Sequence, residues 1–372
     1  MRVAIMGRSY RPGVTGVGSH VGSLIESVGQ ARPGQRVSVF LTQDAPQLAA
    51  PNLVEIRAPF PTPNEYVRAF WEQTVVPWEV ARRGIDLYHS PNFILPLALR
   101  APSIVTIHDL TYLDAGLHKW TSHHYLRTLV ALTLRKANAI VAVSEHTKQQ
   151  VEQHYPEARG RVHVIYQGYR QDIQRPCPGE ITKFLQSDLD HYPYILYVGT
   201  IEPRKNLPRL IAAFEQAVRA ARLDHHLYLV GGWGWKSAEA REALRASPMA
   251  DRIHSVGYVA NERLPLYYAG ADLFVYPSLE EGFGLPPLEA MVCGTPVITS
   301  NCSSLPEVVG DAAITVNPFD VNALADAIGS VLGDAPLQER LRAAGLARSR
   351  RFSWAKAAEE HLRLYETVLG EA

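Results

Sequence analysis

The stretch Ile195-Leu-Tyr-Val-Gly199-Thr-Ile-Glu202-Pro-Arg204-Lys205-Asn-Leu207 joins an apolar run to a helix-length segment through a short loop. The apolar run at residues 195–199 has the length and composition of a buried strand. Residues 207–222 have the length of a helix. A strand that passes through a short loop into a helix is the repeating unit of parallel α/β sheets, so this stretch predicts an α/β fold.

The same alternation extends in both directions along the chain. Helix-length segments separate most of the apolar runs, which favours parallel strands with crossover helices. In the first half we predict strands at residues 3–6, 37–41, 87–89, 104–108, 140–144 and 162–165. In the second half we predict strands at residues 195–199, 227–231, 253–256, 273–276, 297–300 and 313–316.

The length of the chain predicts two domains. Its 372 residues exceed the ~250–300 at which a single core usually stops growing. Residues 167–192 lack clear periodicity and are the expected linker. We therefore predict two doubly wound, Rossmann-like domains, residues 1–175 and residues 190–352. Because open α/β sheets bind ligands at the carboxyl ends of their strands, two such domains facing each other would form a cleft.

Composition excludes several classes of protein. The 37 basic residues balance the 37 acidic residues, so nothing global indicates a nucleic-acid partner. The three cysteines, Cys177, Cys293 and Cys302, have neither CxxC spacing nor an even number, which argues against a zinc cluster or a disulfide framework. We find no signal peptide or spanning segment, and a cytoplasmic protein is the simplest expectation.

Two carboxylates eight positions apart mark a candidate ligand site in Glu281-Gly-Phe-Gly-Leu-Pro-Pro-Leu-Glu289. Gly282 and Gly284 would let the backbone approach a ligand closely. The prolines after Leu285 suit a first helical turn, whose free N–H groups and positive dipole end favour phosphate oxygens. Glu281 would then face sugar hydroxyls, and Glu289 would accept from a ribose. This pattern predicts a nucleotide-sugar site.

Arg204 and Lys205 lie in the short loop between a predicted strand and a helix start. A guanidinium fork beside an ammonium group can neutralise a diphosphate without a metal ion. Asp188-Leu-Asp190 has a spacing that metal-dependent glycosyltransferases use, but it lies in the expected linker, where we interpret it as solvated surface. We therefore predict no metal site.

The first predicted strand is followed by a glycine-rich loop that contains Gly16 and Gly18 and whose amides could hold a pyrophosphate. The glycines lie too far beyond the strand for a dinucleotide fingerprint, which disfavours a nicotinamide enzyme. His108 stands where another strand ends, a position that suits contact with a sugar.

The segment from Leu117 to Lys136 joins basic, histidine and aromatic residues to a strongly apolar helix. One interpretation is contact with anionic lipid or a lipid-linked acceptor. The interpretation we favour is a core helix with a basic rim, because its apolar face is needed to cover the sheet.

With these motifs in order, the chain resembles glycosyltransferase family 4 of the GT-B fold over nearly all of its length. The strongest matches are Gly199–Leu207, Pro277-Ser278 with Glu281–Glu289, and Gly294-Thr-Pro-Val-Ile-Thr-Ser300 followed by Leu305-Pro-Glu-Val. Within the family, Thr-Ile-His108-Asp-Leu, Val-Ser144-Glu-His-Thr-Lys148 and Arg351-Phe-Ser-Trp354 are most similar to bacterial mannosyltransferases that build surface polysaccharides.

The resemblance implies a role for each candidate residue. Catalysis would rest on His108, which binds the sugar, on Arg204 and Lys205, which stabilise the leaving diphosphate, and on Glu281. The full donor-binding set it implies is Gly16, Gly18, Arg204, Lys205, Glu281, Gly282, Phe283, Gly284, Leu285 and Glu289. The family also sends its last helix, here residues 354–372, back to the N-terminal domain.

The expected function is retaining, metal-independent hexosyl transfer, with mannose from GDP-mannose as the donor and a glycan or lipid-linked saccharide as the acceptor. No cofactor is expected. UDP-glucose, UDP-GlcNAc or GDP-fucose as donor, and a sugar-nucleotide epimerase on the same fold, stay open as alternatives. Peripheral association with the inner face of a membrane also stays open.

Overall fold

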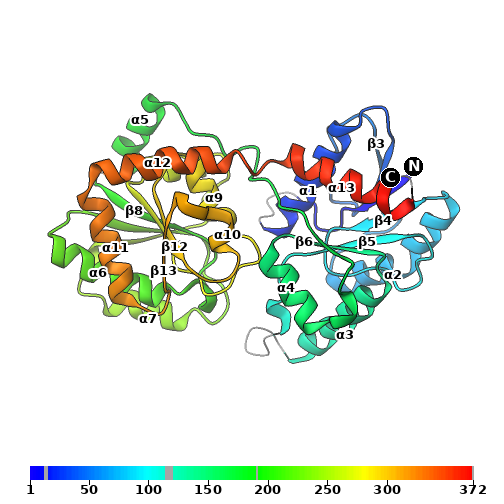
Figure 1. Cartoon of the computed structure of the whole chain (residues 1–372), viewed down its shortest axis with the longest axis horizontal. Coiled ribbons are helices and arrows are strands. Elements are labelled where there is room, and N and C mark those ends of the chain that lie inside the picture. Colours follow the sequence, from blue (N-terminus) through cyan, green and yellow to red (C-terminus); the bar gives the residue numbers. More distant parts are fainter. Residues whose placement is uncertain (12–15, 114–119, 190–191, 371–372) are drawn as a thin grey trace. The chain divides into compact units, whose positions relative to one another are not determined.

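The computed structural model describes residues 1–11, 16–113, 120–189 and 192–370 of the chain. These residues form two compact units (Figure 1). Unit 1 comprises Met1–Arg170 and Phe352–Ala372, and unit 2 comprises Gln171–Arg351. Each unit contains its own sheet.

The sheet of unit 1 has seven strands in the order β3-β2-β1-β4-β5-β6-β7, and every neighbouring pair is parallel. The strands are β1 (Val3–Met6), β2 (Val37–Leu41), β3 (Leu53–Arg57), β4 (Leu87–Ser90), β5 (Ser103–Ile107), β6 (Ala139–Ala142) and β7 (Val162–Val164). The prediction omitted β3. This edge strand contains Glu55 and Arg57 among its five residues, so its apolar run is interrupted.

Helices cover both faces of this sheet. One face packs against α1 (Val17–Ala31) and α13 (Trp354–Leu369), and the other against α2 (Glu65–Arg82), α3 (Trp120–Lys136) and α4 (Glu145–His154). Short 3-10 turns are η1 (Thr111–Leu113) and η2 (Pro156–Ala158). Alternate residues of β1 show the arrangement, since Val3 and Ile5 join the first core and Ala4 and Met6 the second. Both faces are buried, which explains why β1 and β6 consist of apolar residues alone.

The sheet of unit 2 has six parallel strands in the order β10-β9-β8-β11-β12-β13. They are β8 (Tyr194–Val198), β9 (His226–Val230), β10 (Ile253–Gly257), β11 (Leu273–Tyr276), β12 (Val297–Ser300) and β13 (Ile314–Val316). The helices are α5 (Pro178–Asp188), α6 (Leu207–Ala221), α7 (Ala238–Ala246), α8 (Leu264–Gly270), α9 (Leu285–Val292), α10 (Leu305–Val309), α11 (Val321–Gly333) and α12 (Ala335–Ser349), with 3-10 turns η3 (Pro203–Lys205), η4 (Ala250–Arg252) and η5 (Gly310–Ala312). The prediction of two doubly wound α/β units is confirmed.

The expected linker is partly wrong, because residues 167–192 contain α5. Pro178 at the first helical position and a capping interaction between Glu180 and the Cys177 N–H start this helix. Phe184 is its buried anchor and contacts the ring of Tyr267 on α8. The helix has three apolar side chains, Ile181, Phe184 and Leu185, which are too few to give a period that can be recognised in the sequence.

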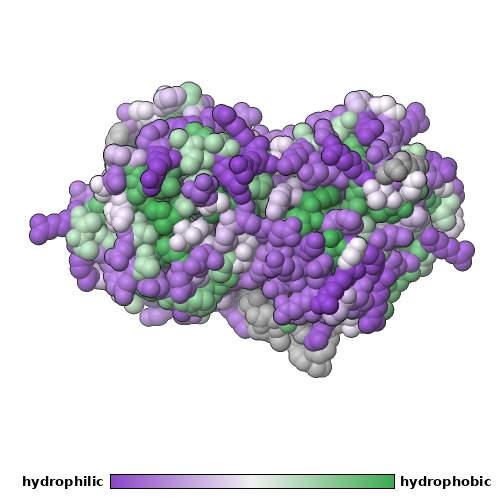
Figure 2. Space-filling view, in the orientation of Figure 1, coloured by the Kyte–Doolittle hydropathy of each residue, from purple (hydrophilic) through white to green (hydrophobic). Residues whose placement is uncertain are grey.

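The visible face of each unit is mostly hydrophilic, with hydrophobic residues in small areas between polar ones (Figure 2). Among the residues described, we find no helix with both the length and the apolar character needed to span a bilayer.

The helix α13 places His361 and Tyr365 against His89 of β4 within unit 1. The Tyr365 hydroxyl lies 2.7 Å from His89 Nδ1, and the ring of His361 stacks on that of His89 with 5.4 Å between centroids. His361 Nδ1 donates to the Ala357 carbonyl at 2.7 Å, while its Nε2 is buried without a hydrogen-bond partner among the residues described. Burial lowers the pKa of His361 to about 4. Both histidines are therefore held neutral.

Acidification should destabilise unit 1. An unfolded histidine has a pKa near 6.5, so the contribution of neutral His361 is complete above pH ~6.5 and is lost as the pH falls toward 4. A pKa difference of this size corresponds to about 3 kcal/mol. Urea unfolding at pH 7.5 and pH 5 should show a lower free energy of unfolding at pH 5. The variant His361→Leu should show a smaller difference between the two pH values, and equal wild-type values at both would contradict the prediction.

Candidate active site

The loop after β8 presents two cations at the carboxyl edge of the unit 2 sheet. Arg204 and Lys205 lie in η3, and Asn206 follows with a φ of 63°, in the left-handed region that asparagine tolerates. The Asn206 side-chain amide donates to the carbonyls of Pro277 (3.1 Å) and Pro318 (2.7 Å). These bonds hold the turn between the strand and α6 in place.

The loop after β11 is attached to the same turn. The Leu279 N–H donates to the Arg204 carbonyl at 2.7 Å, and the Ser278 hydroxyl oxygen lies 3.1 Å from the oxygen of that carbonyl. Farther along, the Ser304 hydroxyl oxygen lies 2.9 Å from the carbonyl oxygen of Glu281 and 2.7 Å from that of Phe283. Since β8 and β11 are neighbours in the sheet, the two loops lie side by side.

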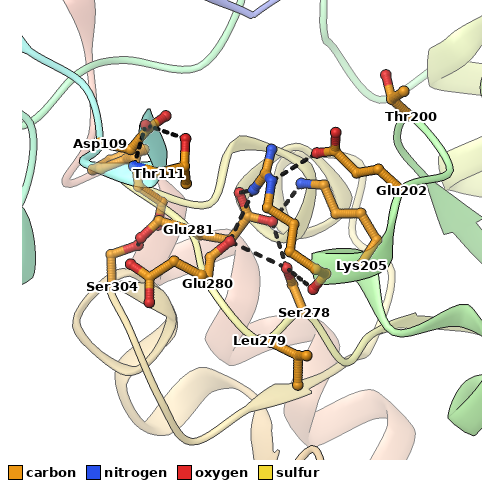
Figure 3. A network of polar contacts seen from close by, with 12 residues as sticks. Asp109, Thr111, Thr200, Glu202, Lys205, Ser278, Leu279, Glu280, Glu281 and Ser304 are labelled. Carbon is orange, nitrogen blue, oxygen red and sulfur yellow. Dashed lines mark hydrogen bonds and ion pairs between the residues drawn. The ribbon is translucent and has the colours of Figure 1, made fainter. Parts of the chain in front are cut away.

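Glu281 is the centre of a closed polar network, and Figure 3 shows Lys205 and Ser278 directed toward its carboxylate. Lys205 Nζ donates to Glu281 Oε1, and Arg204 Nη1 donates to Oε2 at 2.9 Å. The hydroxyls of Ser278 (2.7 Å) and Tyr276 (2.8 Å) also donate to Oε1. One carboxylate thus holds two cations and two hydroxyls.

Arg204 has a second acidic partner. Its Nε lies 2.6 Å from Glu202 Oε1, and its Nη1 also donates to the Glu280 carbonyl at 2.8 Å. The Glu202 carboxylate in turn accepts from the Trp235 ring N–H at 3.1 Å. Arg204 Nη2 makes no hydrogen bond to any residue in the described part of the chain, so it is available to a ligand.

The electrostatics keep this network charged. Burial alone would raise the pKa of Glu281, but Lys205 and Arg204 outweigh it and lower that pKa to about 2. Burial lowers the pKa of Lys205 while Glu281 opposes the shift. Glu281 raises the pKa of Arg204 against the effect of its burial. The carboxylate is therefore ionised at neutral pH, with both cations beside it.

The start of α9 differs from the prediction in the number of free N–H groups that it offers. Gly284 caps the helix with a φ of 116°, and a Cβ there would lie 2.9 Å from Leu305 Cδ2, so this position requires glycine. Pro286 and Pro287 occupy the second and third helical positions and have no N–H. Gly284 and Leu285 therefore supply the two N–H groups of this helix end, and neither has a hydrogen-bond partner among the residues described.

Glu289 lies in the second turn of α9 and is only 5% exposed. Its Oε2 accepts from the Tyr268 hydroxyl on α8 at 3.0 Å. The predicted contact of Glu289 with a ribose stays a prediction.

The remaining predicted residues lie in unit 1. Gly16 caps α1 with a φ of 61°, and Gly18 is buried in the first turn. His108 follows β5 and its Nε2 donates to the Pro91 carbonyl at 2.9 Å. The ring of His20, from α1, contacts that of His108 at 4.5 Å between centroids. The glycine-rich helix start and the strand-end histidine are thus neighbours within unit 1.

Sequence reasoning left four members of the site unassigned: Glu202, Tyr276, Ser278 and Ser304. Tyr276 and Ser278 come at the end of β11, where carboxyl-edge position alone could have identified them. Ser304 is harder to identify, because it lies four residues beyond β12, at the N-cap of the short helix α10, and no local pattern indicates its contact with the Glu281 loop.

Two weaker predictions have partial outcomes. Asp188 ends α5 and pairs with Arg263, whereas Asp190 lies outside the described residues. The basic segment beginning at Leu117 also starts outside them, and the described part of α3 buries Val130 and Leu134 in the core of unit 1. Those two contacts agree with the core-helix interpretation.

Comparison with known proteins gives two family matches that together cover most of the chain. Residues 14–172 match the family described as Glycosyltransferase Family 4, and residues 182–348 match Glycosyl transferases group 1. The second match contains the whole Arg204–Lys205–Glu281 network.

Similar sequences include two mannosyltransferases of Escherichia coli. O-antigen chain mannosyltransferase B is 35% identical over 76% of this chain and 74% of its own length. Serotype-specific mannosyltransferase WbdA is 34% identical over 60% of this chain, and the aligned part is 28% of that longer protein.

Among solved structures, sucrose-phosphate synthase from Thermosynechococcus elongatus superimposes with a TM-score of 0.80, at 23% identity and over 100% of both chains. This likeness and the two parallel sheets confirm the predicted GT-B fold.

Proposed function

Because the chain belongs to glycosyltransferase family 4 and is an enzyme of the kind that includes bacterial mannosyltransferases of polysaccharide biosynthesis, we propose that it transfers mannose from GDP-mannose. The acceptor is a hydroxyl group of a glycan or of a lipid-linked saccharide. Transfer retains the anomeric configuration and needs no bound metal ion. The choice of mannose is supported by the two E. coli relatives, both of which are named mannosyltransferases.

The observation that carries this proposal is the network around Glu281, with two cations at the carboxyl edge of a parallel sheet. Arg204 directs its free Nη2 and Lys205 its buried ammonium at the departing diphosphate. The N–H groups of Gly284 and Leu285 bind phosphate oxygens at the positive end of α9. Glu281 holds both cations in place and accepts hydroxyl groups of the donor sugar.

Such a site stabilises the charge that develops on the leaving group. Placed donors in a buried site act strongly on the transition state because they need no reorganisation during the reaction. With no base assigned in this network, the acceptor proton passes to the departing phosphate on the same face of the sugar. This route accounts for retention without a covalent intermediate.

A donor screen tests the proposal. Thermal unfolding should shift upward with GDP and GDP-mannose more than with UDP, ADP or UDP-glucose, because a ligand that binds only the folded state stabilises it. GDP release with an α-linked mannose oligosaccharide should survive EDTA. A larger shift with UDP would indicate UDP-glucose or UDP-GlcNAc as the donor. A preference for GDP-fucose would indicate fucose as the transferred sugar. Loss of turnover in EDTA would contradict metal independence.

Two further outcomes test the class of reaction and the place of the acceptor. Conversion of the sugar nucleotide without any glycan would indicate an epimerase. Faster turnover with vesicle-bound lipid-linked saccharide than with the free saccharide would favour peripheral membrane association.

A further inference from the structure

A buried ion pair at the carboxyl edge of the unit 1 sheet includes none of the residues assigned above. Arg8 follows β1 by two residues, and its Nη1 lies 2.5 Å from Glu72 Oε2 on α2. Glu72 is 1% exposed, whereas the Arg8 side chain is 17% exposed. Glu72 raises the pKa of Arg8, against the effect of burial. Glu72 thus binds the guanidinium on its buried side, while the outer side of the Arg8 side chain is partly exposed to solvent.

Other groups extend this pair toward the surface. Arg8 Nη2 also contacts Glu65 Oε2 at 3.2 Å, and the other oxygen of Glu65 accepts from Arg68. Glu65, Arg68 and Glu72 are three and four residues apart, so one face of α2 carries all three. Glu65 is 69% exposed and forms the outer rim.

Several polar atoms beside the pair are not satisfied. Glu72 Oε1, the Tyr88 hydroxyl and the Ser90 hydroxyl are buried without a hydrogen-bond partner among the residues described. Tyr88 and Ser90 belong to β4, the parallel neighbour of β1. Burial raises the pKa of Tyr88, and the nearby Glu72 carboxylate raises it further. Buried polar groups normally have partners, and such exceptions point to a function or a ligand.

The position of the cluster is that of a ligand site. The chain emerges from β1 toward Arg8 and from β4 toward Asn92, whose side-chain amide donates to the Ser9 hydroxyl at 2.8 Å. Open parallel sheets bind ligands at this edge. Both Asn92 and Ser9 are half-buried, so their outer sides are accessible.

We propose that Arg8, Glu65 and Asn92 form a binding subsite for a neutral sugar of the acceptor glycan, with Glu72 as the positioning residue that holds the Arg8 guanidinium. This inference rests on the proposed function. The guanidinium donates to one sugar hydroxyl, and the exposed Glu65 carboxylate accepts from a neighbouring one. Asn92 contributes an amide to the same ring.

The charge balance argues for a neutral ligand. The formal charges of Arg8, Arg68, Glu65 and Glu72 sum to zero. Two carboxylates beside Arg8 would repel a phosphate or an acidic sugar, whereas hydroxyl groups can both donate and accept. The cluster therefore favours an uncharged saccharide over a lipid phosphate.

A purely structural role explains the cluster less well. Removing a buried ion pair from water is unfavourable, and well-packed apolar side chains often replace such pairs without loss of stability. A pair retained for packing alone would also not leave one carboxylate oxygen of Glu72 unsatisfied.

The test uses the whole enzyme with GDP-mannose and an α-linked mannotriose as acceptor. Arg8→Ala should raise the acceptor KM by about 10-fold to 100-fold, the range expected for one charge-assisted hydrogen bond. Glu72→Gln should raise it less, because the guanidinium is released but still present. Arg8→Lys should recover part of the affinity, and Arg82→Ala on the exposed end of α2 is the matched control.

Readouts other than turnover keep the inference falsifiable. Ligand-observed NMR should detect mannotriose binding to the wild type and to Arg82→Ala but not to Arg8→Ala. If Arg8→Ala does not fold, the paired variant Arg8→Met with Glu72→Gln removes both charges and takes its place. An unchanged acceptor KM in a folded variant would overturn the subsite.

The outcomes also separate this inference from the proposed function. Loss of affinity only for a phosphorylated mannotriose would make Arg8 an anion site and overturn the neutral-sugar assignment. GDP binding that persists while mannotriose binding is lost supports both proposals, and failure of GDP and GDP-mannose to bind the wild type would contradict the donor instead.

Discussion

Replacing Lys205 or Arg204 with alanine is expected to lower kcat by about 10²–10³-fold, the effect typical of losing one electrostatic donor from a catalytic site. Each substitution removes a positive charge that, in the proposed mechanism, stabilises the leaving diphosphate. Lys205 is 6% exposed and no other lysine or arginine except Arg204 pairs with Glu281 in the described residues, so no neighbour can replace it. Initial rates of GDP release, measured at saturating GDP-mannose and acceptor, check the prediction.

The control is Arg219→Ala, which removes an exposed cation from α6, the helix that follows this turn. It should leave kcat within about twofold of the wild type. Arg204→Lys should retain the charge but lose the planar fork, so its kcat should lie between those of the wild type and Arg204→Ala. Wild-type turnover in both alanine variants would remove the cationic pair from the mechanism.

The fold could be predicted from the sequence to the extent that strands were buried on both faces. Apolar runs such as residues 273–276 and 297–300 coincide with β11 and β12 because nothing in a doubly covered strand is exposed to water. The prediction missed the edge strand β3 and the helix α5, because part of each is exposed to solvent. Their patterns reflect mixed environments and give no clear period.

The sequence predicted where the candidate site lies, but not which of its residues form ion pairs with one another. Because Arg204, Lys205 and Glu281 each lie beyond the end of a predicted strand, each could be identified as a candidate site residue on its own. Their ion pairs depend on the sheet order, in which β8 and β11 are adjacent although two strands separate them in the chain. No local pattern specifies that order. The family resemblance assigned Glu281 to sugar hydroxyls, and only the structure adds its contact with both cations.

Glu281→Ala is expected to lower the free energy of unfolding by about 3–5 kcal/mol, the range for breaking a buried ion pair by removing one partner. Among the residues that the structure describes, the Tyr276 hydroxyl would then be the remaining hydrogen-bond partner of the Lys205 ammonium group. Chemical denaturation at pH 7 measures the change. Glu242→Ala removes one partner of an exposed pair with Arg245 and should change the free energy of unfolding by less than about 1 kcal/mol.

The same carboxylate should contribute to acid stability. Its pKa is about 2 in the folded chain and near 4.3 when unfolded, so its contribution is complete above pH ~4.5 and is lost as the pH falls through 2. The Glu281→Ala variant should therefore show a weaker dependence of stability on pH between 4.5 and 2 than the wild type. Parallel curves over this range would contradict an ionised, paired Glu281.

Combining Glu281→Ala with Lys205→Met should separate stability from activity. The double variant leaves no unpaired ammonium group in the interior, so part of the lost free energy of unfolding should return relative to Glu281→Ala alone. Its kcat should stay as low as that of Lys205→Ala, because an apolar side chain cannot stabilise a departing diphosphate. Recovery of turnover together with stability would mean that the network serves only to hold the two loops together.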